Sequence, residues 1–130
     1  MLSTHLTQPH LILLIDDDES MYTLISTLYT KYRFRWFDNG TDGLHAIRAY
    51  SKTASLVILD YEMKNGLNGF AVLEDTRRNL PNIPILMWSG SHSIKQEALE
   101  KGASAFLEKP FDPNELESTI STLISQKNNS

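Results

Sequence analysis

Five polar side chains that could take part in phosphoryl chemistry come directly after aliphatic stretches of the sequence. Three are carboxylates, one is a hydroxyl and one is an amine: Asp16, Asp17, Asp60, Ser89 and Lys109. Carboxylates held close together repel one another and need a cation, and an all-oxygen cluster suits a hard one such as Mg²⁺. Because Mg²⁺ uses one or two carboxylates and keeps several waters, one aspartate would stay free to attack phosphorus. Lys109 and Ser89 would then contact the phosphoryl oxygens.

The elements that must position these side chains follow from the hydrophobic pattern. Short apolar runs predict strands at residues 11–15, 34–37, 56–59, 85–88 and 105–107. Helical spacing predicts helices near residues 21–29, 41–50, 70–78 and 94–99, and a last one from 113 to about 125, with a fraying tail from Gln126. Strict alternation of strands and helices implies a parallel sheet with helices on both faces, and ligands of such sheets bind at the carboxyl ends of the strands.

Local signals sharpen the helix boundaries. The first helix should bury Met21, Leu24, Ile25, Leu28 and Tyr29. Asp18 or a neighbour should cap its start, Gly102 should follow the end of the fourth helix, and Asp112 with Pro113 should open the last one. Asp38 also follows a strand, but Asp38-Asn39-Gly40 is explained by a turn.

Composition limits the class of protein. The chain has 130 residues, enough for one domain, with no cysteine, 41% hydrophobic residues and a net charge of −4. The basic residues are scattered, which argues against nucleic-acid binding by this domain. The longest aliphatic run, residues 11–15, is too short for a membrane span. We therefore expect a cytoplasmic domain that does not interact with membranes.

At this point the sequence resembles a known family. The stretches LILLIDDDE, LVILDYEM, PILMWSG and GASAFLEKPF are similar, in order and spacing, to motifs of bacterial two-component response-regulator receiver domains, the chemotaxis regulators included. The similarity runs from about residue 10 to about 125, so residues 1–130 are expected to be a single receiver domain. The resemblance implies a doubly wound α/β fold, a five-stranded parallel sheet of order 2-1-3-4-5 with five helices.

The resemblance also assigns the residues around the phosphoacceptor. Asp60 looks like the phosphoacceptor and Mg²⁺ the cofactor. Asp16 and Asp17 look like the acidic pair, with Asp17 as a direct metal ligand and Asp16 acting mostly through water. The backbone carbonyl of Glu62 would complete the metal ligands together with Asp60.

Four further positions match residues that bind the phosphoryl group or transmit the signal. Ser89 matches the switch hydroxyl and Lys109 the phosphate-binding lysine. Phe106 matches the aromatic residue that rotates on activation, although its position also suits a plain core residue. Pro110 matches a proline whose preceding peptide bond is often cis, as cis bonds are mainly a proline feature.

Two departures from the family pattern concern the loop after Asp60. Lys64 stands where a proline is usual, and the loop is one residue longer before Gly69. Glu62 adds a carboxylate two residues past the phosphoacceptor. Either change could alter the lifetime of the phosphoryl group or the choice of kinase, and neither removes a ligand.

The implied function is signalling rather than turnover of an external substrate. A sensor histidine kinase or a histidine phosphotransfer protein would donate the phosphoryl group, and the domain would catalyse only its own phosphorylation and dephosphorylation. The downstream partner is not visible in the sequence, and a homodimer formed on phosphorylation is one form the output could take. The four histidines, His5, His10, His45 and His92, are expected at the surface, and Met63 and Trp88 as packing residues.

Two rival interpretations stay open at the level of sequence. Asp16, Asp18 and Ser20 fit the D-x-D-x-[ST] pattern of phosphatases that resemble the haloacid dehalogenases, with Asp16 as nucleophile and Asp18 as acid. That reading lacks a later acidic pair for the metal, and it predicts that an Asp60→Ala variant keeps its phosphatase turnover. The other rival is a binding module whose partner ignores phosphorylation.

Overall fold

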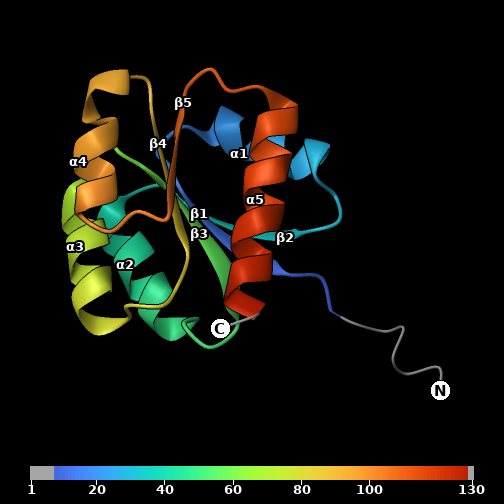
Figure 1. The fold of residues 1–130 in the computed structure, drawn as a ribbon, viewed down its shortest axis with the longest axis horizontal. Helices are drawn as coiled ribbons and strands as arrows, with labels where there is room; N and C mark the ends of the chain where they lie inside the picture. The colour runs from blue at the N-terminus through green and yellow to red at the C-terminus, as the bar shows by residue number, and fades with distance from the viewer. Residues whose placement is uncertain (1–7, 129–130) are drawn as a thin grey trace.

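A five-stranded parallel sheet forms the centre of the computed structural model, which describes residues 8–128 (Figure 1). The strands are β1 (Leu11–Ile15), β2 (Arg33–Phe37), β3 (Ala54–Asp60), β4 (Ile85–Ser89) and β5 (Ala105–Glu108). Their order is β2-β1-β3-β4-β5, and every pair is parallel. The predicted fold class and strand order are confirmed.

Two strands begin earlier than the aliphatic runs suggested. β2 starts at Arg33 and β3 at Ala54, because the sheet pairs Leu11 with both of them. The charged Arg33 and the polar Ser55 concealed these starts from a prediction based on apolar runs. At their other ends, β3 and β4 include Asp60 and Ser89 as last residues, so the sheet itself holds both side chains.

Helices connect consecutive strands, and a final helix follows the last strand. They are α1 (Glu19–Leu28), α2 (Gly40–Ala49), α3 (Gly69–Asn79), the 3₁₀ turn η2 (His92–Ile94) that leads into α4 (Lys95–Glu100), and α5 (Pro113–Asn128). The side chains of Asp18, Asn39 and Asn68 accept backbone N–H bonds at the starts of α1, α2 and α3. The predicted Asp18 cap is confirmed. α5 continues past the expected end near residue 125, and Lys127 donates to the backbone carbonyl of Ala54.

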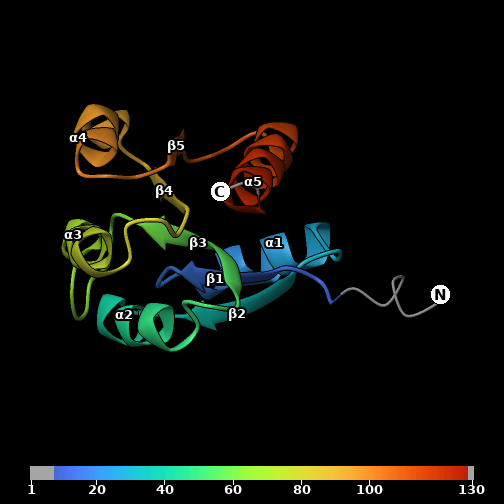
Figure 2. The same ribbon diagram turned by 60° about the horizontal axis from the view of Figure 1, so that its bottom comes forward.

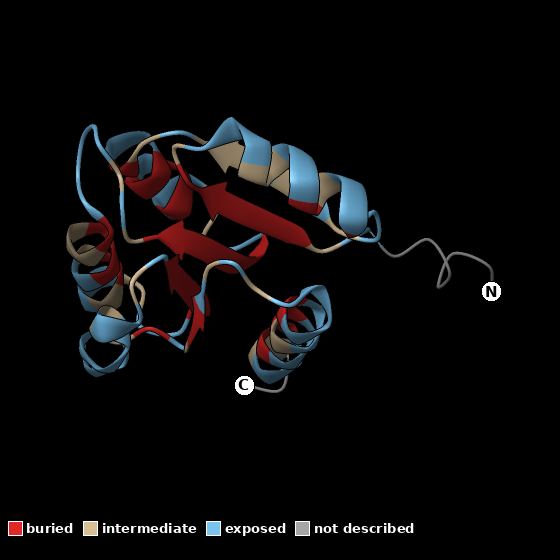
Figure 3. Cartoon of the chain, turned by 90° about the horizontal axis from the view of Figure 1, so that it is seen from above, coloured by how far each residue is buried: buried red, intermediate tan, exposed pale blue. Residues whose placement is uncertain are grey.

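The sheet separates two hydrophobic clusters. α2, α3 and α4 cover one face, and α1 and α5 cover the other (Figures 1 and 2). Successive side chains of a strand point to opposite faces of the sheet, so Met87 belongs to the first cluster and Trp88 to the second. Figure 3 shows buried strands between helices whose outer sides are exposed. Among the described helices, none is long and apolar enough to cross a membrane.

α1 buries a narrower stripe than predicted. Ile25 is fully buried, whereas Leu24 and Leu28 are 46% and 48% exposed. The buried side runs through Tyr22 and Ile25 to Tyr29, and Leu24 and Leu28 lie about 100° around the helix from Ile25 and Tyr29. Tyr29 follows the end of α1, and its hydroxyl donates to the backbone carbonyl of Pro113 at 2.7 Å. The two helices on this face are thus joined at the start of α5.

A close backbone contact fixes the loop that follows β3. A Cβ atom on Gly69, the first residue of α3, would lie 2.6 Å from the carbonyl oxygen of Asp60. Only glycine permits this approach, which ties the start of α3 to the end of β3. The loop at residues 61–68 therefore leaves and returns at nearly the same point of the sheet, the end of β3.

Candidate functional site

The three predicted aspartates meet at the carboxyl edge of the sheet. Asp16 and Asp17 follow β1, and Asp60 ends the neighbouring strand β3. One carboxylate oxygen from each of Asp16, Asp17 and Asp60 lies within 4.8 Å of the others, and no other such group is found among residues 8–128. This convergence results from the strand order, because β1 and β3 are adjacent although 43 residues lie between Asp16 and Asp60 in the sequence.

Asp16 is the most enclosed of the three carboxylates. It is 0% exposed. Its Oδ1 accepts the backbone N–H of Asp18 at 2.9 Å. Its Oδ2 accepts the indole N–H of Trp88 at 2.9 Å and the ammonium of Lys109, also at 2.9 Å. Because these donors occupy most of its acceptor positions, Asp16 is suited to act on a cation through water, as the resemblance implied.

Asp17 and Asp60 have fewer hydrogen-bond partners. Asp17 is half-buried, and its Oδ2 accepts the backbone N–H of Lys64 at 3.2 Å. Asp60 is 2% exposed, and its Oδ1 accepts from Lys109 Nζ at 3.3 Å. Burial raises the pKa of Asp60 to about 7, and repulsion from Asp16 adds to the effect although Lys109 opposes it. A cation at this position would relieve the same repulsion.

Lys109 lies between the two buried aspartates. Burial alone lowers the pKa of its ammonium, but the hydrogen bond to Asp16 and the charge of Asp60 outweigh burial, so that the pKa is raised. The lysine is therefore charged at neutral pH. When all three carboxylates are ionised, the single ammonium leaves two negative charges, which fits a divalent cation bound by oxygen ligands.

Ser89 has a partner that the sequence did not predict. It is 0% exposed, and its hydroxyl donates to Glu62 Oε2 at 2.6 Å. The other oxygen of Glu62 accepts the backbone N–H of Gly90 at 3.3 Å. The carboxylate of Glu62, which departs from the family pattern, therefore holds the Ser89 hydroxyl and the start of the loop after β4. The role expected for the backbone carbonyl of Glu62 stays a prediction.

The loop after β5 is built around aromatic packing. The Lys109–Pro110 peptide bond is cis, as predicted. Phe111 stacks on Trp88 with ring centroids 5.3 Å apart and planes inclined by 9°. Trp88 is fully buried, so the expected packing role holds, but its hydrogen bond to Asp16 gives it a second role. Phe106 is 9% exposed and belongs to the cluster beneath α2, α3 and α4.

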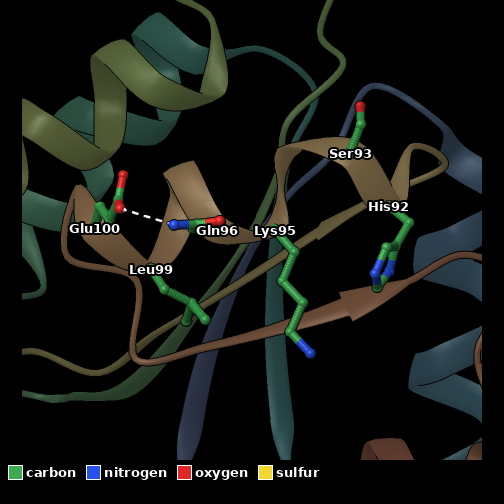
Figure 4. Close-up of a pocket in the computed structure, with 6 residues that line it drawn as sticks. All are labelled: His92, Ser93, Lys95, Gln96, Leu99 and Glu100. Carbon is green, nitrogen blue, oxygen red and sulfur yellow. Dashed lines mark hydrogen bonds between the residues drawn. The ribbon is translucent and has the colours of Figure 1, made fainter.

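A surface hollow lies beside α4, away from the three aspartates. Figure 4 shows its lining side chains, with His92, Lys95 and Leu99 leaving the helix on the side of β5 and Gln96 bonded to Glu100 at 3.2 Å. His92 also lies 3.3 Å from Glu108 on β5. The first residue that lines the hollow, His92, lies three positions after Ser89 in the sequence, and none of the three aspartates lines it.

Two other sequence expectations can be checked. Of the histidines, His45 and His92 are exposed, His10 is half-buried and bonded to the Ser55 hydroxyl at 2.8 Å, and His5 lies outside the described residues. The phosphatase alternative needs Asp18 as an acid beside Asp16. Instead, Asp18 caps α1 and accepts from Ser20, which lowers its pKa and keeps it ionised. The arrangement does not favour that alternative.

Comparisons with known proteins find similar sequences and the same fold. The family model described as the response regulator receiver domain matches residues 12–121. The CpxR homolog of Haemophilus influenzae, a transcriptional regulatory protein, is 33% identical over 115 residues, which are 87% of this chain and 49% of that protein. The putative two-component response regulator ARR21 of Arabidopsis thaliana is 28% identical over 91% of this chain and 19% of its own length.

Solved structures agree with these sequence matches. A putative response regulator from Chloroflexus aurantiacus superposes with a TM-score of 0.81 at 27% identity, covering 91% of this chain and 99% of the other. The receiver domain of NtrX from Brucella abortus gives 0.78 at 27% identity, covering 88% and 98%. The chain spans about half or less of the length of the two curated relatives described above.

Proposed function

The chain belongs to the response regulator receiver domain family, and from this premise we propose that Asp60 accepts a phosphoryl group from a histidine kinase or a histidine phosphotransfer protein. One observation carries the proposal. Asp60 ends a central strand and is nearly buried, with two other aspartates and an ammonium around it. A carboxylate in that position can be a nucleophile only when positive charge offsets its neighbours.

The transfer step forms one bond and breaks one. An oxygen of Asp60 attacks phosphorus, and the bond between phosphorus and the donor imidazole breaks, with its electron pair left on the imidazole nitrogen. Mg²⁺, when bound, supplies positive charge to the phosphoryl oxygens. Asp17, Asp60 and the backbone carbonyl of Glu62 would hold the ion, with Asp16 acting through water. Lys109, already 3.3 Å from Asp60, needs only a short movement to reach a phosphoryl oxygen.

Ser89 is the residue that must change partner. Its hydroxyl now donates to Glu62, so donation to a phosphoryl oxygen requires that bond to break. Drawing Ser89 inward would open space beside β4, which Phe106 on the paired strand β5 would fill. Because packed interiors switch between discrete arrangements, we expect a two-state change in the surface of α4, β5 and α5. The hollow in Figure 4 lies on that surface.

The domain would act as a signalling switch rather than as an enzyme with an external substrate. Its own side chains would catalyse gain and loss of the phosphoryl group, and the altered surface would bind a downstream protein or a second phosphorylated copy. Because a histidine kinase takes its phosphoryl group from ATP, we expect the domain to meet that kinase in the cytoplasm. We take residues 1–130 as one receiver unit, without membrane or nucleic-acid binding of its own, whatever further domains its longer relatives carry.

Phosphorylation by a small donor tests the proposal directly. Acetyl phosphate with Mg²⁺ should add one phosphoryl group by intact mass, labile to hydroxylamine as an acyl phosphate is. Asp60→Ala should abolish the gain. Asp38→Ala is the matched control, because Asp38 follows β2 at the same edge of the sheet but outside the cluster, and should leave the gain intact. An Asp60→Ala protein that still gains the mass, or that turns over phosphatase substrates, would refute the assignment.

A further inference from the structure

Two tryptophans donate hydrogen bonds to the same buried aspartate. The indole N–H of Trp36 on β2 donates to the backbone carbonyl of Asp16 at 2.7 Å. The indole N–H of Trp88 on β4 donates to Asp16 Oδ2 at 2.9 Å. Asp16 is thus held at its backbone from the adjacent strand β2 and at its carboxylate from β4, which lies two strands away on the other side. Packing alone does not require either N–H to meet an oxygen.

The carboxylate oxygen held by Trp88 is also the one held by Lys109. Oδ2 of Asp16 accepts from both, each at 2.9 Å, while Oδ1 accepts from the backbone of Asp18. A buried carboxylate oxygen that loses its donors is costly. If Lys109 were the only donor at Oδ2, any movement of the lysine toward a phosphoryl group would leave that oxygen unpaired.

We propose that Trp88 is a positioning residue of the site: its indole N–H keeps Asp16 satisfied and oriented, which frees Lys109 to bind the phosphoryl group. The inference rests on the proposed function of Asp60 and Lys109. It assigns the indole a task that an aromatic ring without an N–H could not perform. Trp36 performs no such task, because it bonds the backbone oxygen and leaves the carboxylate charge untouched.

The contacts around Trp88 hold its indole ring, and so its N–H donor, in a fixed position. The ring is fully buried and stacks on Phe111. Lys109 Nζ lies 5.3 Å from the centroid of the same ring. The aromatic face therefore remains beside the ammonium while its N–H edge holds Asp16, and the lysine can exchange oxygen partners without leaving the ring.

Removal of the N–H with retention of an aromatic side chain tests the proposal. Beryllofluoride with Mg²⁺ is the probe, and its affinity is measured by calorimetry for the wild type, Trp88→Phe and Trp36→Phe. Trp88→Phe should weaken binding by about tenfold or more, the usual effect of removing a group that orients a metal-site ligand. Trp36→Phe should weaken it clearly less. Benzothienylalanine at position 88, which keeps the bicyclic shape without the N–H, should reproduce Trp88→Phe and covers the case in which that variant folds poorly.

A second measurement uses the protein without metal or phosphoryl mimic. Lys109→Met should lower the urea midpoint more in the Trp88→Phe background than in the wild type, because Oδ2 of Asp16 then loses both side-chain donors. Additive midpoint shifts, or unchanged beryllofluoride affinity in both position-88 variants, would overturn the proposal while leaving Asp60 as acceptor. Failure of the wild type itself to bind beryllofluoride would instead overturn the proposed function.

Discussion

Neutralising Asp60 should stabilise the metal-free protein, and the gain should depend on pH in a defined direction. The carboxyl of Asp60 has a pKa near 3.8 in the unfolded chain and about 7 in the folded one, chiefly because of burial and then of Asp16. Between these values the folded state binds more protons than the unfolded state. The free energy of unfolding therefore falls as pH rises through this window. Asp60→Asn removes the titrating group and so removes this loss.

The size of the effect follows from the shift. A rise from 3.8 to about 7 is roughly three pKa units. At about 1.4 kcal/mol per unit this corresponds to about 4 kcal/mol, fully expressed above pH 7 and absent below about pH 4. Asparagine also gives Lys109 a weaker partner than a carboxylate does, which subtracts about 1 kcal/mol. We expect Asp60→Asn to be more stable than the wild type by about 2 to 4 kcal/mol at pH 8.

Urea unfolding in the presence of a chelator measures the effect, with free energies extrapolated linearly at about pH 4.5, 6, 7 and 8. Asp75→Asn is the control with the opposite sign. The hydrogen bond from Arg48 lowers the pKa of Asp75, so that the stability it contributes is present at neutral pH and lost as pH falls through the folded-state pKa. Asp75→Asn should therefore be less stable than the wild type at neutral pH, by an amount that shrinks in acid.

Two outcomes would refute the reasoning. A stability difference between Asp60→Asn and the wild type that stays constant from acid to pH 8 would mean that Asp60 does not titrate as described. A less stable Asp60→Asn at pH 8 would mean that Lys109 compensates the carboxylate fully. Saturating Mg²⁺ provides an internal check, because a cation bound only to the folded wild type should raise its stability and narrow the gap.

Three further substitutions test other parts of the structure. Glu62→Ala removes the acceptor that holds Ser89, so beryllofluoride should shift the NMR signals of residues 90–109 at a lower half-saturating concentration; an unchanged value would contradict the role of that bond. Thr76→Val should stabilise the fold by roughly 1 kcal/mol in urea unfolding, because the Thr76 hydroxyl is the buried side-chain atom without a partner among the described residues. Gly102→Ala should cost about 1 to 3 kcal/mol in the same assay, since φ is +111° there and the new Cβ would lie 2.6 Å from Cγ of Arg77.

The sequence pattern was sufficient for the alternation of strands and helices, and the family resemblance supplied the strand order. Parallel strands bring their carboxyl ends to one edge, and in that order Asp16 lies beside Asp60. The helices were predictable because apolar spacing, caps and glycines are local signals in the sequence. Where local signals were absent, the predictions fell short. β3 begins at Ala54 because its neighbours pair with it, and α5 continues beyond residue 125, where Lys127 reaches the carbonyl of Ala54.

Hydrogen bonds between side chains of different strands and loops could not be predicted from the sequence. Trp88 and Asp16 are 72 positions apart, and nothing near either residue indicates that the indole N–H meets the carboxylate. The bond between Ser89 and Glu62 spans 27 positions. An extra carboxylate after Asp60 was visible, but its target depended on the direction of the side chain. Such contacts depend on which rotamer each side chain adopts among its packed neighbours. The hydrophobic periodicity of a sequence carries no information about that rotamer.

The alternation of buried side chains along β4 has a consequence for how signals could be routed. Met87 faces the cluster under α4, and Trp88 faces the cluster under α5. By the same alternation Ser89 returns to the side of Met87 and Phe106. A phosphoryl group on Asp60, as proposed, would therefore have two routes to the surface, one through Ser89 on the side of α4 and one through Trp88 and Phe111 on the side of α5. The effects on stability of substitutions in one cluster should add to the effects of substitutions in the other. Evolution could therefore change the surface over one cluster without altering the surface over the other.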